Sequence, residues 1–403
     1  MSSLYIFNPE NDLALADGCR NYYPPPAARK IAGDLAMLPI WYAVDDSYVV
    51  VPKFTDGAYI NDVSAQFGIK AQILQPTEVR AHETIASCVP WGWSPYISKR
   101  FTDMGVDAGI LPPSEAIALY RDLSNRKTTV AILTSLSQAG IDVPEPLPCY
   151  TSSLAEAMRF VETNRRSILK APWSGSGRGL VWGRGIYERS VEQLCRGIIN
   201  RQGGIICEKA LDKVLDFAME FRADGENVEF AGYSLFCTDE KGAYRGNMLA
   251  SDTFIEELLC RYVGQETLVM LKQVLPEILQ KLFGGKYKGV CGIDMMIYRD
   301  GSICRIAPCI ELNLRMSMGA LARIFYDRYV KDGVLGRLDI LYFGKPGEAE
   351  SYCSDTVSKY PPSISSGKLV AGAVLLAPVC GDTGYAAVAR CGLAESEFQE
   401  FPV

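Results

Sequence analysis

The chain has 403 residues, enough for about two to four domains of ordinary size with a sizeable core. Apolar residues make up 48% of it and charged residues 22%, a balance that is typical of globular proteins and excludes a disordered chain. The 41 basic and 47 acidic residues give a formal net charge of −6, so we expect no general attraction to nucleic acid or to an anionic membrane.

The length of the apolar stretches and the numbers of histidines and cysteines exclude further classes of protein. The longest apolar stretch, Leu369 to Cys380, contains Gly and Pro and is too short to cross a bilayer. The N-terminal residues do not match a signal peptide, so we expect a cytoplasmic protein. His82 is the one histidine, which excludes a His-rich metal site and leaves a Ser-His-Asp triad wholly dependent on it. The 13 cysteines are scattered without a CxxC pair, so we interpret most of them as small buried residues in a reducing compartment.

The N-terminal part of the sequence alternates between strand-like and helix-like segments. Residues 4–7, 47–52 and 71–74 predict short buried strands, and residues 27–38 predict a helix. Such alternation indicates an open parallel sheet, whose ligands lie beyond the carboxyl ends of the strands. The loop from Asn8 to Asp12 follows the first strand, so we expect it at a binding edge.

The rest of the chain changes from helix-rich to strand-rich near Gly204. The expected helices are 114–125, 127–138, 151–163 and 265–282, and the expected strands are 167–170, 205–209, 217–223, 229–236, 289–298, 302–313, 368–375 and 385–389. The segment Arg299-Asp-Gly301 predicts a hairpin turn between two of these strands.

A glycine-rich loop is the first segment that carries chemistry. Lys170 ends a strand, and a loop with Gly175, Gly177 and Gly179 follows at once. Glycine lets backbone N–H groups approach a phosphate closely, and a lysine supplies the countercharge. Because the lysine precedes the glycines, this is not a Walker A loop. An ordinary glycine-rich hairpin loop is the alternative interpretation.

A second segment, at the end of the strand 205–209, is suited to a purine. Backbone groups near Glu208 and Lys209 can face the edge of the base, and the Glu208 carboxylate can accept from an amine or a ribose hydroxyl. A solvated sheet edge is the alternative.

The strongest signal is a set of three oxygen-bearing side chains, Asp294, Glu311 and Asn313. Glu311 and Asn313 are two residues apart, so in a strand they share one face, and Arg315 continues the row. Carboxylate and amide oxygens suit Mg²⁺, whose other ligands are water and phosphate oxygens. The alternative is the polar face of a hairpin.

In order and chemical type, these segments resemble the ATP-grasp superfamily, which includes biotin carboxylase, D-alanine–D-alanine ligase and glutathione synthetase. The resemblance covers about half of the chain, from Asn125 to Gly319. It implies an α/β fold with α+β lobes, in which an N-terminal open α/β pre-ATP-grasp unit precedes a two-lobed ATP-grasp fold. The implied division is an acceptor-binding unit at 1–115, a small lobe at 116–204, a large lobe at 205–345 and a strand-rich C-terminal extension at 346–403.

The resemblance also implies roles for individual residues. The implied nucleotide-binding residues are Lys127 at the α-phosphate, Lys170, Ser174, Gly175, Ser176 and Gly177 at the β- and γ-phosphates, Glu208 and Lys209 around adenine, and Glu220 on the next strand. Asp294, Glu311 and Asn313 resemble the magnesium ligands, and Arg315 is similar to an arginine that stabilises the acyl phosphate.

Two features depart from the family pattern. A two-residue turn at Asp300-Gly301 would place Asp294 opposite position 307, four residues short of Glu311, so we expect a bulge or loop near Pro308. The residues after Arg315, Met-Ser-Met-Gly319, differ from the Gln-Val-Glu-His continuation of biotin carboxylases.

Further candidate residues flank this site, each with a structural alternative. Arg245 and Asn247 lie where some relatives place a basic residue on the transferred phosphoryl group, and a hairpin-tip arginine is the alternative. Glu10, Asn11 and Asp12 follow the first strand, as acceptor-binding residues or as an Asx-rich turn. The indoles of Trp91 and Trp93 are suited to stacking on a substrate, but a loop that covers the core is the interpretation we favour. We expect His82 to be structural.

The resemblance implies an ATP- and Mg²⁺-dependent ligase that joins a carboxylate to an amine or thiol through an acyl phosphate, with release of ADP and phosphate. One or two Mg²⁺ ions, or Mn²⁺, would be the metal. The expected partners are small-molecule substrates, and a homodimer is expected on general grounds alone. Two alternatives stay open: a small-molecule kinase on the same scaffold, and a nucleotide-binding module without turnover.

Overall fold

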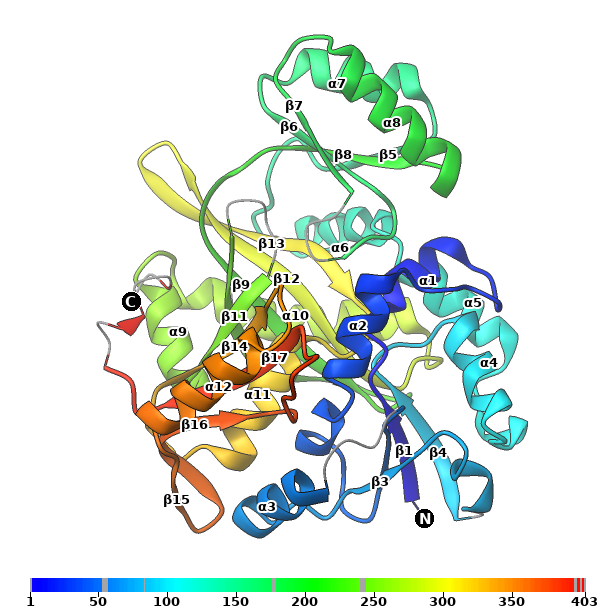
Figure 1. Cartoon of the computed structure of the whole chain (residues 1–403). Helices are drawn as coiled ribbons and strands as arrows, with labels where there is room; N and C mark the ends of the chain where they lie inside the picture. Colours follow the sequence, from blue (N-terminus) through cyan, green and yellow to red (C-terminus); the bar gives the residue numbers. More distant parts are fainter. Residues whose placement is uncertain are drawn as a thin grey trace.

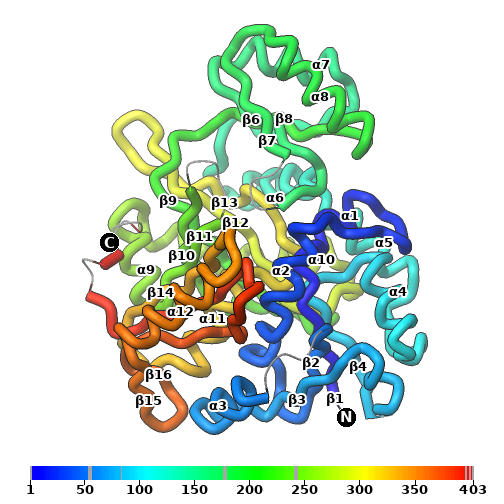
Figure 2. The backbone as a smooth tube through the Cα atoms, in the orientation of Figure 1, coloured from blue at the N-terminus to red at the C-terminus, as the bar shows by residue number. Residues whose placement is uncertain are grey.

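The computed structural model describes residues 2–52, 57–82, 84–175, 179–239, 244–394, 397, 398 and 401. The strands of this part form an N-terminal sheet, a small-lobe sheet and a large sheet. In Figures 1 and 2 the small lobe lies at the top, the N-terminal unit at the lower right and the large sheet in the centre and left.

The N-terminal unit contains the open parallel sheet that the sequence predicts, in the order β3-β2-β1-β4. Its strands are β1 (Ser2–Ile6), β2 (Tyr48–Val50), β3 (Gln72–Leu74) and β4 (Ile85–Pro90). The helices of the unit are α1 (Asn11–Asp17), α2 (Pro26–Asp34), α3 (Gly57–Phe67), α4 (Pro95–Asp103) and α5 (Ser114–Leu123). The sequence does not predict β4, because its Ser, Cys and Pro residues interrupt the apolar run that marks the other strands.

The small lobe consists of a four-stranded antiparallel sheet with two helices on one face (Figure 1). Its strands, in the spatial order β5-β8-β6-β7, are β5 (Cys149–Thr151), β6 (Ser167–Lys170), β7 (Leu180–Gly183) and β8 (Ile205–Lys209). Its helices are α7 (Leu154–Thr163) and α8 (Arg189–Gln202), and α6 (Lys127–Gln138) leads into it with the bounds that the sequence predicts. The lobe has a hydrophobic cluster of its own, which includes Val161, Leu169 and Cys207.

The large sheet has nine strands in the order β13-β12-β9-β10-β11-β14-β17-β16-β15. They are β9 (Asp212–Ala223), β10 (Val228–Thr238), β11 (Tyr244–Leu249), β12 (Gly289–Asp300), β13 (Ile303–Asn313), β14 (Gly336–Tyr342), β15 (Ser363–Ser365), β16 (Lys368–Leu375) and β17 (Tyr385–Cys391). The accompanying helices are α9 (Asp252–Cys260), α10 (Gln265–Phe283), α11 (Met318–Tyr329) and α12 (Glu348–Lys359). The strand-rich C-terminal segment therefore continues this sheet through the pairing of β14 with β17, while the division of the chain into four units stays a prediction.

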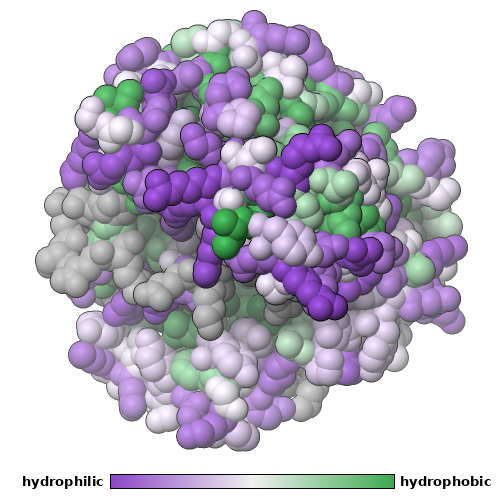
Figure 3. Space-filling view, turned by 90° about the horizontal axis from the view of Figure 1, so that it is seen from above, coloured by the Kyte–Doolittle hydropathy of each residue, from purple (hydrophilic) through white to green (hydrophobic). Residues whose placement is uncertain are grey.

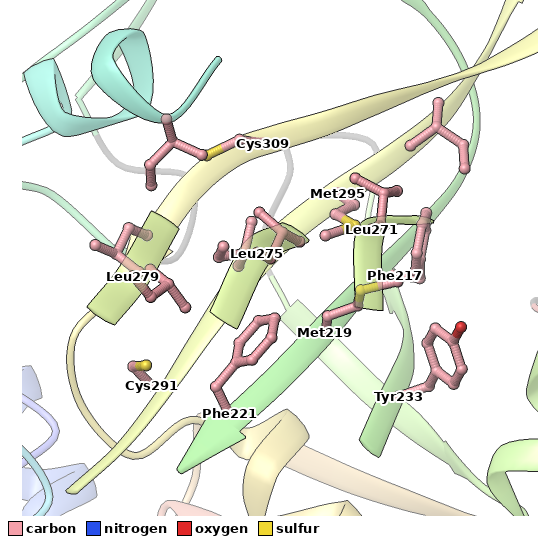
Figure 4. Packing of buried hydrophobic residues seen from close by; sticks show 14 of the residues in the cluster. Phe217, Met219, Phe221, Tyr233, Leu271, Leu275, Leu279, Cys291, Met295 and Cys309 are labelled. Carbon is pink, nitrogen blue, oxygen red and sulfur yellow. The ribbon is translucent and has the colours of Figure 1, made fainter. Parts of the chain in front are cut away.

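Alternation along β9 separates a core face from a polar face. Phe217, Met219 and Phe221 point toward the apolar side of α10, where Figure 4 shows them beside leucines of that helix. Because side chains alternate in a strand, Glu220 lies on the opposite face. The core on one side of the sheet thus fixes which side can hold a polar site.

A second hydrophobic cluster joins the N-terminal unit to the large sheet and α11. Trp41 is fully buried, its ring packs against Phe325 at 5.2 Å between centroids, and its Nε1 donates to the carbonyl of Leu376 at 2.8 Å. An aromatic anchor of this size makes the two units pack as one body.

The remaining features of the fold concern its surface and its cysteines. In the described part of the chain, no helix is long and apolar enough to cross a membrane. Hydrophilic side chains dominate the face in Figure 3, with hydrophobic ones in scattered patches. The thirteen cysteines are free thiols and most of them are buried, as expected.

Candidate active site

A cleft of about 380 Å³ lies between the small-lobe sheet and the polar face of the large sheet. Lys170 and Glu208 line it from the small lobe, and Glu220, Asp294 and Glu311 line it from the large sheet. Figure 1 shows the strands of the small lobe above β12 and β13, which carry two of these acids. The structure therefore brings together residues that are far apart in the sequence.

The small-lobe wall of the cleft carries an ion pair. Lys170 at the end of β6 and Glu208 on the adjacent strand β8 lie 2.7 Å apart between Nζ and Oε2, and both side chains are largely buried. Lys209 also lines the cleft, whereas Ser174, in the loop that follows β6, is buried and is not among the residues that line it. A lysine that is held by a carboxylate in this way is positioned at the cleft before any ligand binds.

Arg126 is a cleft residue that the sequence interpretation missed. Its side chain is 6% exposed, and its guanidinium donates to the carbonyls of Ala171 at 2.8 Å and Ser174 at 2.9 Å. The same group donates to Glu311 Oε2 at 2.6 Å, so one arginine ties the loop after β6 to the large sheet. A planar guanidinium with several donors makes such multiple contacts where a lysine cannot.

The hairpin of β12 and β13 places the three predicted metal ligands together. Asp294 pairs directly with Glu311, and Gly292 pairs with Asn313. The register shifts between Asp294 and Met296, since Met296 pairs with Ala307. The predicted bulge near Pro308 is thereby confirmed, although the hairpin turns at residues 301 and 302, one position later than expected, because Asp300 pairs with Ile303.

Burial and like charge perturb the acids on this face. Burial, together with the nearby Glu311 carboxylate, raises the pKa of Asp294 to about 7. Burial and the Asp294 carboxylate raise the pKa of Glu220 to about 8, although Ser317 donates to Glu220 at 3.0 Å. Glu220 Oε2 is buried without a hydrogen-bond partner among the described residues. Acids in this arrangement favour a proton or a cation between them.

The donor set fits a hard divalent cation. Asp294, Glu311 and Asn313 offer carboxylate and amide oxygens at one place, which is the ligand type that Mg²⁺ takes. Within the described residues no group of three His, Cys, Asp or Glu side chains is arranged to hold a metal, so the set depends on the Asn313 amide as its third member.

Arg315 lies at the end of the cleft and contacts the N-terminal unit. Its Nε and one terminal nitrogen donate to the two carboxylate oxygens of Asp12 at 2.9 and 2.8 Å. Asp12 belongs to α1, which follows β1, so the predicted binding edge of the parallel sheet does reach the cleft. The bidentate pair fixes the orientation of Arg315.

Comparison with known proteins identifies the fold. No protein-family model and no curated protein matches the sequence. N5-carboxyaminoimidazole synthetase from Staphylococcus aureus, complexed with ADP, matches with a TM-score of 0.51 and 11% identity over 99% of this chain and 95% of its own. Biotin carboxylase from Campylobacter jejuni, complexed with a β,γ-ATP ligand, matches with a TM-score of 0.51 and 12% identity over 97% of this chain and 87% of its own. Both are ATP-grasp enzymes. The chain has the ATP-grasp fold.

Two predicted basic residues, Lys127 and Arg245, do not line the cleft. Lys127 points away from it, is 43% exposed and pairs with Asp122 at 2.5 Å. Adjacent residues at a helix start differ in direction by about 100°, so when Arg126 faces the cleft Lys127 cannot. Arg245 is exposed on β11 and is absent from the cleft lining, whereas Asn247 of the same strand lines it and donates to Ser234 at 2.6 Å.

The glycine-rich loop is described in part. Gly175 lines the cleft, and a Cβ on it would lie 2.5 Å from the Asp12 carboxylate, so glycine is needed for this close approach. Ser176 and Gly177 lie outside the described residues.

Of the remaining candidates in the N-terminal unit, Asp12 forms an ion pair with a residue of the cleft, Arg315. Glu10 is buried 3.9 Å from Arg100, and burial raises its pKa. Asn11 is buried against Gly92. His82 packs at 4.8 Å from the ring of Tyr48, a structural position.

Proposed function

We propose that the protein is an ATP- and Mg²⁺-dependent ligase that joins a carboxylate to an amine or thiol through an acyl phosphate. The observation that carries the proposal is the cleft itself, in which the cations Arg126 and Lys170 face the carboxylates of Asp294 and Glu311. Phosphoryl transfer requires cations that bind the phosphates and oxygen ligands that hold a metal ion, and this cleft brings both together.

The nucleotide would lie between the two lobes. Glu208 and Lys209 are proposed to contact adenine and ribose, and Lys170 and Arg126 to contact the phosphates. We assign to Arg126 the phosphate contact that the family resemblance implied for Lys127, because Arg126 lines the cleft. Asp294, Glu311 and Asn313 would hold Mg²⁺, which would supply positive charge against the negative charge that builds up in phosphoryl transfer.

The reaction proceeds in two steps. A carboxylate oxygen of the first substrate attacks the γ-phosphorus, the bond to the β,γ-bridging oxygen breaks, and ADP leaves. The amine or thiol then attacks the acyl carbon, phosphate leaves with the electron pair of the acyl–oxygen bond, and the nucleophile loses its proton to phosphate or solvent. We assign to Arg315 the stabilisation of the oxyanion that forms at the acyl carbon.

The test is a stoichiometric assay with ATP, Mg²⁺ and panels of carboxylic acids, with and without amines and thiols. Release of ADP and phosphate that requires both substrates supports the ligase. ADP release with a hydroxylated acceptor and no free phosphate identifies a kinase instead. Nucleotide binding without ADP release from any acceptor, unchanged by Glu311→Ala, identifies a binding module. Location in the cytoplasm and assembly as a homodimer stay predictions.

A further inference from the structure

A second cavity, of about 890 Å³, begins where the nucleotide cleft ends. Arg315 lines both cavities, so the two meet at the residue that we place at the acyl carbon. The walls of the second cavity come from β4 and the loop after it, the start of α5, the end of β9, the start of β12, and α11. Its volume lies within the range of about 300–1,000 Å³ that small-molecule sites occupy.

Four cations line this cavity in addition to Arg315. Arg222 lies at the end of β9, Lys286 and Lys288 precede β12, and Arg328 lies on α11. Among the described residues, none of the four forms an ion pair with a carboxylate, and Glu115 is the acid that shares the lining. Cations that outnumber the acids around a concave surface favour an anionic ligand.

Aromatic rings form the other walls. Trp91 and Trp93 line the cavity on either side of Gly92, and Tyr42 and Tyr120 line it from other elements. A Cβ on Gly92 would lie 3.0 Å from Arg315 Cβ and 2.5 Å from the Asn11 side chain. The loop that carries Trp91 and Trp93 therefore packs closely against Arg315. The hydroxyl of Tyr42 is buried without a hydrogen-bond partner in the described part of the chain.

We propose that this second cavity binds the carboxylate substrate, and that this substrate is an aromatic molecule with a further anionic group. The inference rests on the proposed ligase function. The reacting carboxylate lies at Arg315, the ring lies between the tryptophans and tyrosines, and the distal anion, a carboxylate or a phosphate, contacts Arg222 and its neighbouring cations. The loop of Trp91 and Trp93 therefore serves a binding site as well as covering the core.

The test measures binding by calorimetry without ATP, so that its outcome is independent of turnover. The probes are benzene-1,3-dicarboxylate, biphenyl-4,4′-dicarboxylate and 4-phosphonooxybenzoate, compared with benzoate and the non-aromatic dianion adipate. We expect at least one dianionic aromatic probe to bind about tenfold or more tightly than benzoate and adipate. The phosphorylated probe shows whether the distal anion is a phosphate or a carboxylate.

Variants decide which residues provide the preference. Arg222→Ala combined with Lys288→Ala should remove the advantage of the dianionic probes and leave benzoate binding unchanged. The matched control is Lys281→Ala with Arg299→Ala, which changes exposed cations outside both cavities and should have no effect. Absence of binding by all three probes, equal binding of benzoate or adipate, or a preference that survives in the double variant would overturn the proposal. Loss of ATP binding or of turnover, with probe binding retained, would contradict the ligase function and leave the anion site standing.

Discussion

Paired charges organise the cleft at the scale of single residues. Arg126 contacts Glu311 at 2.6 Å and Lys170 contacts Glu208 at 2.7 Å, so each cation that we assign to phosphate is held by a carboxylate. Breaking a buried pair by removing one partner is costly, because the other charge is left without compensation. When ATP and Mg²⁺ bind, a phosphate would take the place of Glu311 beside Arg126, and Mg²⁺ would take the place of Arg126 beside Glu311. Each charge would then stay compensated.

Substitution of Arg126 tests this arrangement. We expect Arg126→Ala to lower kcat/KM for ATP on the order of a hundredfold, because it removes a phosphate contact and leaves Glu311 unpaired. Lys127→Ala is the matched control, since its side chain is exposed and lies outside the cleft, and should stay within about twofold of the parent. Steady-state kinetics checks both variants, and thermal unfolding checks that Arg126→Ala is folded. An equal loss in the two variants would show that the helix start, and not the Arg126 side chain, contacts ATP.

At the scale of elements, sequence pattern and pairing contribute different information. The sequence predicts α6 with its bounds and the bulge near Pro308, because helix periodicity and proline effects are local. It misses Arg126, because the direction of a side chain at a helix start depends on where the backbone enters. It also treats the C-terminal strands as an extension, because the pairing of β14 with β17 joins residues that no local pattern connects.

The turn that closes the glycine-rich loop gives a prediction at this scale. Gly179 has φ of +70°, its carbonyl accepts from Ala171 at 3.0 Å, and an added Cβ would lie 3.0 Å from the Ala171 Cβ. We expect Gly179→Ala to cost about 1 kcal/mol of stability and to weaken ATP binding by up to about tenfold, because the loop shifts from Lys170.

The control for this prediction is Gly333→Ala. Gly333 has φ of +78° with open space around its Cβ position, so the backbone strain is similar and no cleft residue moves. Denaturant unfolding and nucleotide titration measure the two effects separately. Equal ATP affinity in the two variants would mean that the closing turn does not position the loop.

At the scale of the whole molecule, the two walls of the cleft differ in how they are supported. The large sheet lies in an extensive core that α6, α9 and α10 complete, and the Trp41 cluster joins it to the N-terminal unit. The small lobe depends on its own smaller cluster between its sheet and the helices α7 and α8. Segments with a smaller core open at lower free-energy cost, so we expect motion that admits a nucleotide to belong to the small lobe.

Hydrogen exchange of backbone amides tests this division of stability. We expect amides of β5, β6 and β8 to exchange faster than those of β9 and β12, because the larger core protects the latter strands from local opening. A non-hydrolysable ATP analogue with Mg²⁺ should slow exchange in β6 and β8. Lys170 and Glu208, which lie on these strands, would then contact the nucleotide, and this contact would oppose local opening of the strands. The same addition to Arg126→Ala at equal analogue concentration should slow it less, which ties the protection to the cleft. Uniform exchange in both lobes, or protection confined to the N-terminal unit, would show that the nucleotide does not bind between the small lobe and the large sheet.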